Sequence, residues 1–235
     1  MAVTRQTYEE ALHVQSYATM VEALALDPET VYGLYRTDQA LYEKNQTVLE
    51  AISKISDPTF QTGTLKTDKM FLESCVGNII LEGIYFYSAF LIFYVLRRNG
   101  KMPGSAEMIQ FINRDEDMHL KLFINITNTI REEQPELWDE EFQNQIIKNI
   151  KDAVEMEYQW GASCISDGIL GLTPANLKEY LQFVGDMRLL ALGLPKQWNS
   201  KNPFPWIDEF TQGSMIEVNF FEGTVREYQS GTLEW

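Results

Sequence analysis

The sequence predicts an all-α protein that folds as a helical bundle, and three observations carry this prediction. Apolar residues recur at helical spacing along most of the chain. Helix-breaking or helix-starting residues separate these stretches, among them Pro28, Asn99-Gly100 and Thr173-Pro174. The chain has two histidines, and each follows a glutamate by three residues. Residues at that spacing share one face of a helix, so both pairs are expected on helices.

Taken in order, the expected helices cover most of the chain. They span residues 4–26, 30–56, 66–99, 105–133, 136–163 and 174–192. Residues 1–212 are therefore expected to form one domain, which 235 residues are long enough to provide with a full core. Residues 213–235 contain Gly223, Gly231 and few packing residues, so we expect a flexible C-terminal tail.

Composition excludes several classes of partner. The formal net charge of −15 argues against a nucleic-acid or anionic membrane surface. Residues 79–96 are apolar and long enough to span a bilayer, but Glu82 lies inside them and favours a buried central helix. Cys75 and Cys164 form no CxxC pair and are expected as buried free thiols in a reducing cytoplasm.

The two histidine motifs indicate a metal centre. They are Glu10-Ala-Leu-His13 and Glu116-Asp-Met-His119. One Glu-x-x-His on each of two helices, with a carboxylate from each of two others, is how a four-helix bundle holds two iron or manganese ions. Glu82 supplies an inward carboxylate on a third helix. The plain alternative for a single motif is an ordinary surface pair.

Apolar and aromatic residues flank the expected ligands. Phe86 and Phe90 lie on the helical stripe of Glu82, and Ile112 lies one turn before Glu116. They would wall a buried site, or they are ordinary core residues. Tyr17 lies one turn past His13, which makes it a candidate redox residue beside a metal or a packing tyrosine with a satisfied hydroxyl.

Four stretches resemble one family over nearly the whole chain. They read TRQTYEEALHVQSY, ILEGIYFYSAF, INRDEDMHL and NPFPWIDEF followed by NFFEGTVREYQSG, and they resemble the small, radical-generating subunit of class I ribonucleotide reductase. The resemblance implies a ferritin-like fold and a centre of two iron ions, or manganese, or a mixed pair. It implies metal ligands at five positions: Glu10, His13, Glu82, Glu116 and His119.

The resemblance also implies roles for other residues. Tyr17 would carry a tyrosyl radical in an apolar pocket lined by Phe86, Phe90 and Ile112. Asp115 matches the aspartate that orients a histidine ligand and joins the electron-transfer path. In the tail, Tyr228 is the best match for a redox tyrosine.

The implied activity is that of a ribonucleoside-diphosphate reductase. The dimetal centre would react with oxygen and oxidise Tyr17, and the radical would pass to a large catalytic subunit on which the tail docks. The resemblance further implies a homodimeric core. Two rival hypotheses remain: a ferritin-like metal store or oxidase, and a metal-incomplete subunit that only binds a partner.

One departure from the family affects the metal site. In the family an earlier helix provides the first carboxylate ligand, an aspartate, and a Trp for radical transfer lies further upstream. Neither stands ahead of Glu10 in these residues. We expect a separate N-terminal polypeptide, or the rest of a longer chain, to supply them. Asp38 or Glu43 could instead donate the sixth ligand, although such residues usually face solvent.

Overall fold

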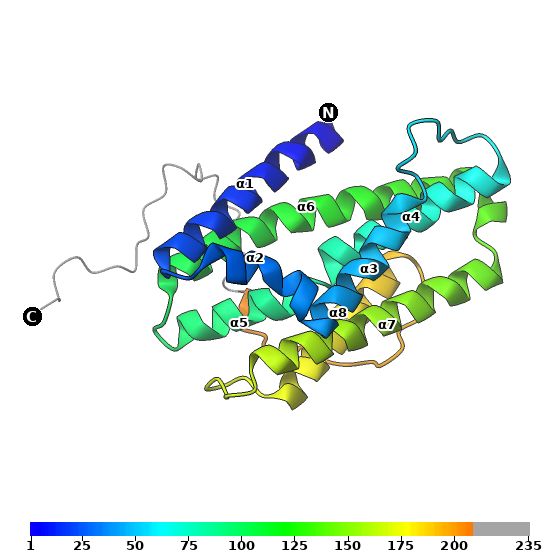
Figure 1. Ribbon diagram of the computed structural model, residues 1–235. Coiled ribbons are helices and arrows are strands. Elements are labelled where there is room, and N and C mark those ends of the chain that lie inside the picture. Colours follow the sequence, from blue (N-terminus) through cyan, green and yellow to red (C-terminus); the bar gives the residue numbers. More distant parts are fainter. Residues whose placement is uncertain (209–235) are drawn as a thin grey trace, which may run out of the picture.

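The computed structural model describes residues 1–208, and within them it confirms an all-α bundle (Figure 1). Its α-helices, in chain order, are α1 (Ala2–Ala23), α2 (Pro28–Thr37), α3 (Gln39–Ser53), α4 (Leu65–Gly83), α5 (Tyr87–Arg98), α6 (Pro103–Glu133), α7 (Glu140–Cys164) and α8 (Pro174–Ala191). A short 3-10 helix, η1 (Pro135–Leu137), joins α6 to α7.

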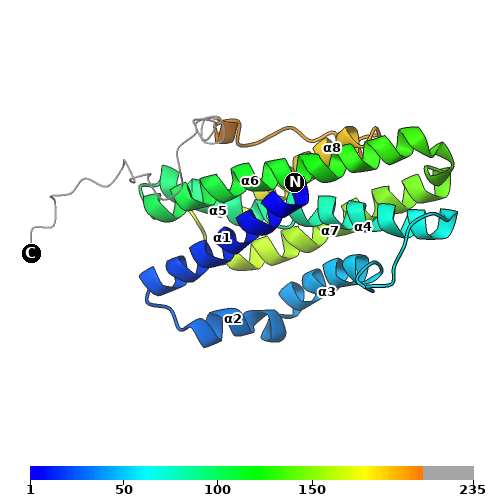
Figure 2. The same ribbon diagram turned by 90° about the horizontal axis from the view of Figure 1, so that it is seen from above.

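The helices are arranged around α4, α5 and α6. The central helix α4 packs along α6, α6 packs on α5, and α7 packs on α8. Seen from above, α2 and α3 lie on one side of the bundle and α8 on the other (Figure 2). The buried apolar core comes almost entirely from α4 to α8. In contrast, α1 buries a single apolar residue, Met20, and α2 buries none.

Local sequence signals place the helix starts. Asp27 and Asp139 cap α2 and α7 by accepting hydrogen bonds from backbone N–H groups of the first turn. Thr64 and Thr173 form reciprocal capping boxes at α4 and α8. At the end of α5, Gly100 adopts a φ of 70°, as expected for a helix-ending glycine.

The helix expected over residues 30–56 is two helices. Asp38 breaks it, with φ −88° and ψ 115°, and its side chain accepts a hydrogen bond from the N–H of Leu41. The same residue thus ends α2 and caps α3, which is where aspartate is favoured. The continuous helical spacing of apolar residues concealed this break.

The helix expected over residues 66–99 is also broken, between α4 and α5. The N–H of Tyr85 reaches back five residues to the carbonyl of Ile80, and the regular ladder stops there. Side chains from other helices satisfy the freed backbone groups. Lys44 Nζ donates to the carbonyl of Tyr85 at 2.6 Å, and Arg188 Nε donates to the carbonyl of Gly83 at 2.9 Å.

The structure also shows where the long apolar stretch and the two cysteines lie. By length and composition, residues 65–98 include a stretch apolar enough to cross a membrane, but 61% of that stretch is buried inside the bundle. This agrees with a buried central helix. Cys75 is buried as expected, whereas the expectation for Cys164 was wrong, because it lies exposed in the last turn of α7.

Candidate metal centre

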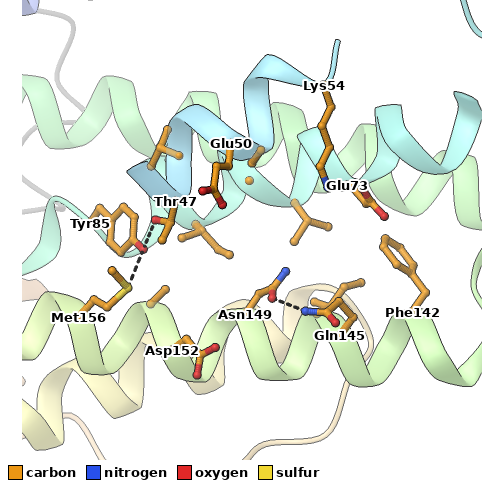
Figure 3. Close-up of a pocket in the computed structure, with 17 residues that line it drawn as sticks. Thr47, Glu50, Lys54, Glu73, Tyr85, Phe142, Gln145, Asn149, Asp152 and Met156 are labelled. Carbon is orange, nitrogen blue, oxygen red and sulfur yellow. Dashed lines mark hydrogen bonds and ion pairs between the residues drawn. The ribbon is translucent and has the colours of Figure 1, made fainter. Parts of the chain in front are cut away.

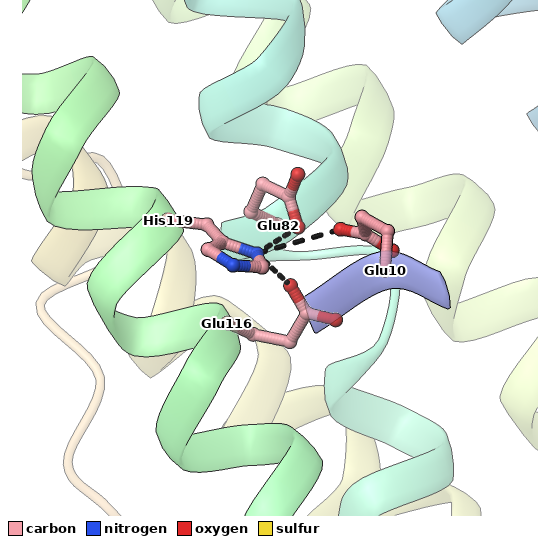
Figure 4. A group of neighbouring side chains, drawn as sticks. All are labelled: Glu10, Glu82, Glu116 and His119. Carbon is pink, nitrogen blue, oxygen red and sulfur yellow. Dashed lines mark hydrogen bonds and ion pairs between the residues drawn. The ribbon is translucent and has the colours of Figure 1, made fainter. Parts of the chain in front are cut away.

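Three helices bring the five expected ligands together. Helix α1 carries Glu10 and His13, α4 carries Glu82, and α6 carries Glu116 and His119. Figure 4 shows Glu10, Glu82 and Glu116 turned toward the imidazole of His119. One ligand atom from each of these four residues lies within 4.8 Å of the others. A space of that size between donor atoms suits a metal ion.

The imidazoles present the same nitrogen to the carboxylates. Nδ1 of His119 lies 3.0 Å from Glu116 Oε2, 3.4 Å from Glu10 Oε1 and 3.9 Å from Glu82 Oε2. Nδ1 of His13 lies 3.1 Å from Glu116 Oε1 and 3.6 Å from Glu10 Oε2. The two ring centroids are 6.0 Å apart. Glu116 therefore lies between the two histidines with one oxygen toward each, and Glu10 does the same at slightly longer distances.

Two buried polar atoms in this cluster lack a hydrogen-bond partner among the described residues. They are Oε2 of Glu82 and Nδ1 of His13, which has Glu116 Oε1 as an ion-pair neighbour at 3.1 Å but makes no hydrogen bond. The other oxygen of Glu82, Oε1, accepts a hydrogen bond from Gln6 Nε2 at 3.1 Å. An unpaired buried polar atom is costly, and a bound cation would relieve both of these. The donor set of carboxylate oxygens and imidazole nitrogens fits iron or manganese.

The cluster has strongly shifted proton affinities. Burial opposes charge on His13, yet its contacts with Asp115, Glu10 and Glu116 outweigh burial and raise its pKa to about 11. The pKa of His119 rises to about 12 for the same kind of reason. Burial raises the pKa of Glu82 to about 8. Without metal, protonated imidazoles therefore supply the positive charge that balances these carboxylates.

Helix α1 is attached through this cluster rather than through apolar packing. Its buried residues besides Met20 are Glu9, His13 and Ser16, which share one face at helical spacing. Glu9 is a contact that the sequence reasoning missed, and its Oε2 lies 3.0 Å from Nε2 of His119. The polar stripe formed by Glu9, His13 and Ser16 could have indicated this contact, since the stripe of a helix that faces the core is normally apolar.

Comparison with known proteins identifies the family. The sequence profile described as "Ribonucleotide reductase, small chain" matches residues 1–203. The chain belongs to the ribonucleotide reductase small-chain family. The ribonucleoside-diphosphate reductase subunit beta of Chlamydia pneumoniae is 38% identical over 98% of this chain and 67% of its own length. The corresponding subunit of Halalkalibacterium halodurans is 33% identical over 94% of this chain and 64% of its own length.

A solved structure supports the fold of this small chain. The ribonucleotide reductase R2 subunit from Clostridium botulinum superposes with a TM-score of 0.78 at 34% identity, over 88% of this chain and 64% of that one. The chain thus spans about two thirds of the length of the relatives it matches.

Other residues expected from the small-chain family are placed as follows. Asp115 Oδ2 lies 3.4 Å from Nε2 of His13, on the ring edge away from the ligand cluster, and Arg114 holds its other oxygen. Phe90 and Ile112 are buried, and Phe86 is half-buried beside Phe90. Tyr228 and the tail lie outside the described residues.

Tyr17 is placed near the cluster but is less enclosed than expected. Desolvation and the charges of Glu116 and Glu10 raise the pKa of its hydroxyl well above the usual value. Even so, the residue is 36% exposed. The dry pocket expected for a radical is therefore not closed by the described part of the chain.

Asp38 and Glu43, the two residues considered as internal sources of the sixth ligand, lie outside the ligand cluster. Asp38 caps α3, and Glu43 Oε1 accepts a hydrogen bond from Gln39 Nε2 at 2.6 Å. Neither belongs to the grouped ligand atoms. The described residues thus bring together the five expected ligands but not these two substitutes.

A cavity of about 460 Å³ lies away from the ligands, between α3, α4 and α7 (Figure 3). At one end Tyr85 Oη lies between Thr47 Oγ1, at 2.8 Å, and Met156 Sδ, at 3.7 Å. At the other end Lys54 and Glu73 form an ion pair of 2.7 Å. None of the five expected ligands lines this cavity.

Proposed function

We propose that this chain is the radical-generating small subunit of a ribonucleoside-diphosphate reductase. The observation that carries the proposal is the convergence of Glu10, Glu82, Glu116 and His119 from three helices, with His13 in contact with Glu10 and Glu116; all but the half-buried Glu10 are buried. Membership of the small-chain family supports the same activity. A metal store would share the carboxylates but has no need of a tyrosine one turn beyond a ligand.

The five ligands would hold two iron ions, two manganese ions or one of each. Hard carboxylate oxygens and neutral imidazoles suit both metals, so availability in the cell decides between them. When bound, this centre supplies the oxidising power that produces the radical on Tyr17. The protein binds and insulates the ions and fixes the tyrosine near them.

The residues around the ligands have separate tasks. Asp115 accepts the outer N–H of His13 and keeps Nδ1 directed at the metal. Gln6 holds one oxygen of Glu82 and leaves the other free to bind. Phe86, Phe90 and Ile112 would provide apolar surface on one side of the radical pocket, whose other side the described residues leave open.

Manganese binding tests the metal assignment. We expect Mn(II) to bind the full chain, measured as loss of the free-ion electron paramagnetic resonance (EPR) signal, and we expect His119→Ala to weaken it strongly. Asp152→Asn is the control, because Asp152 is an exposed carboxylate on α7. Equal Mn(II) binding by His119→Ala and Asp152→Asn would show that the assignment is wrong.

We also infer that a helix outside these 235 residues completes the centre. It would carry the sixth ligand, an aspartate, and lie against α1 and α4 beside Glu10 and Glu82. Uncovered apolar side chains on α1 support this, because Val3, Val14 and Tyr17 lie on the side of the helix that carries Glu10, and exposed apolar patches mark contact surfaces. Large exposed apolar residues are concentrated in the first three helices and their connections: Val3, Tyr8, Val14, Tyr17, Leu24, Leu26, Tyr32, Leu34, Tyr35, Tyr42 and Leu49.

In its simplest form this helix belongs to a separate N-terminal polypeptide. We expect the 235-residue chain alone, loaded with Fe(II) or Mn(II) and exposed to oxygen, to form little tyrosyl radical. Adding the polypeptide should restore the EPR signal and bury Val3 and Val14, which lie on the same side of α1 as Glu10 and are 61% and 69% exposed. A full radical yield from the chain alone would contradict this inference.

Three further parts of the proposal concern the large subunit, the oligomeric state and the location in the cell. Residues 213–235 dock on the large catalytic subunit, so a peptide ending at Trp235 should compete with the protein for that subunit. Tyr228 is the tail residue proposed to pass the radical. We propose a homodimeric core and a cytoplasmic location, with neither nucleic acid nor membrane as a partner, in keeping with the acidic net charge.

A further inference from the structure

The two histidines of the cluster have matching surroundings on their outer ring edges. Nε2 of His13 faces Asp115 Oδ2 at 3.4 Å, and Nε2 of His119 faces Glu9 Oε2 at 3.0 Å. Each of these carboxylates comes from a helix other than that of its histidine. The family resemblance provided the first pair, whereas it gave no role to Glu9.

Each carboxylate is also held by a guanidinium from its own helix. Arg114 donates to Asp115 Oδ1 at 3.0 and 3.1 Å, and Arg5 Nε donates to Glu9 Oε1 at 2.8 Å. In both cases the arginine occupies one oxygen and leaves the other for imidazole. Two parallel chains of contact result, Arg114–Asp115–His13 and Arg5–Glu9–His119.

The orientation of His119 gives Glu9 a specific consequence. Nδ1 of His119 faces Glu10, Glu82 and Glu116, so it is the nitrogen that would bind metal. The proton must then be on Nε2, and a carboxylate at that nitrogen fixes both the tautomer and the ring plane.

The burial of Glu9 is not explained by its ion pair with Arg5. The Arg5 side chain is 65% exposed and the Glu9 side chain only 7%. A pair of this kind could lie entirely in solvent, where it would contribute little. The partner that lies inside the protein is His119.

We propose that Glu9 is a positioning residue for His119. It accepts the Nε2–H of His119 and holds Nδ1 toward the metal, as Asp115 does for His13. Partners of this kind commonly change metal affinity by about 10- to 100-fold. The inference rests on the proposed metal-binding function, and it adds a residue to it.

Mn(II) titration of the full chain tests the proposal. Glu9→Ala should weaken Mn(II) binding about 10- to 100-fold. Glu9→Gln should weaken it less, because the amide oxygen still accepts the hydrogen bond but carries no charge. The control is Glu22→Ala, which removes an exposed carboxylate from the same helix.

A second readout separates positioning from general damage to α1. In the Zn(II)-loaded protein, ¹⁵N spectra of the imidazoles should show a protonated Nε2 on His119, and in Glu9→Ala this signal should be altered while that of His13 is retained. If Glu9→Ala binds Mn(II) as tightly as Glu22→Ala, or leaves the His119 signals unchanged, the positioning role is wrong. If the unmodified chain binds no Mn(II), the metal-binding function itself fails.

Discussion

Replacing Lys44 by methionine should destabilise the fold by about 3–5 kcal/mol, the usual effect of leaving a buried charge without its partner. Lys44 Nζ lies 2.5 Å from Glu157 Oε2 and donates to the carbonyl of Tyr85. Glu157 is completely buried and also accepts hydrogen bonds from the backbone N–H and the hydroxyl of Ser88. Both partners thus hold the break between α4 and α5, just beyond the expected ligand Glu82.

Thermal unfolding measures this effect. For a chain of this size each kcal/mol shifts Tm by about 2–4 °C, so the Tm of Lys44→Met should fall by roughly 6–20 °C. The matched control is Lys148→Met, which breaks an exposed pair with Asp152 that we expect to contribute at most about 1 kcal/mol. Adding Glu157→Gln to Lys44→Met should recover much of the loss, because no unpaired charge then remains.

The loss of stability in Lys44→Met should also depend on pH, and it should be larger at higher pH. Burial already raises the pKa of Glu157 above its ordinary 4.5, and loss of Lys44 removes the main opposing charge and raises it further. Well below pH 4.5, Glu157 is protonated in both folded and unfolded protein, so the deficit should shrink as pH falls toward that range and grow as pH rises above it. A Lys44→Met variant that loses no more stability than Lys148→Met, at any pH, would refute this reasoning.

Three further predictions concern the site. Tyr17→Phe should retain metal and fold but lose the tyrosyl EPR signal of the completed, oxygen-exposed protein; an unchanged signal would assign the radical to another tyrosine. Mn(II) affinity should rise between pH 6.5 and 8 by about tenfold per pH unit for each proton that the metal displaces, because the raised pKa values of His13 and Glu82 keep both residues protonated without metal. Calorimetry in buffers of different ionisation enthalpy counts the displaced protons. An Mn(II) affinity that does not change with pH would contradict these pKa shifts. Amide hydrogen exchange in α1 should slow markedly on Mn(II) binding while that in α7 stays unchanged, because α1 is held mainly by polar ligands; equal protection with and without metal would contradict this.

The sequence was informative wherever a local pattern determines structure. Thr173-Pro174 and Asn99-Gly100 marked a helix start and a helix end because capping and positive φ are local properties. The ligand-bearing helices followed from Glu-x-x-His spacing, and the structure brings Glu10 and His119 together across α1 and α6.

Interactions between distant segments could not be predicted in this way. The break after Gly83 depends on Lys44, Glu157 and Arg188, which are far from it in the chain. Likewise, the pairing of Glu9 with His119 joins residues 110 apart in sequence. Spacing shows which residues share a helix face, but it does not show which helix that face meets.

The incomplete enclosure of Tyr17 has a different origin. The sequence pattern predicted an apolar wall from residues now placed on α5 and α6, and Phe90 and Ile112 are indeed buried. What the pattern could not show is the open side of α1 beside Glu10, where Val3 and Val14 are exposed. That surface is where we expect the helix that completes the centre.

Anomalous diffraction from crystals of the full chain soaked with Mn(II) tests the central claim most directly. We expect manganese peaks between the carboxylates of Glu10, Glu82 and Glu116 and the Nδ1 atoms of His13 and His119. Two peaks, each beside one imidazole and one oxygen of Glu116, would show that Glu116 binds both ions. Ordered manganese elsewhere with none among these five side chains would contradict the metal centre, and with it the proposed function.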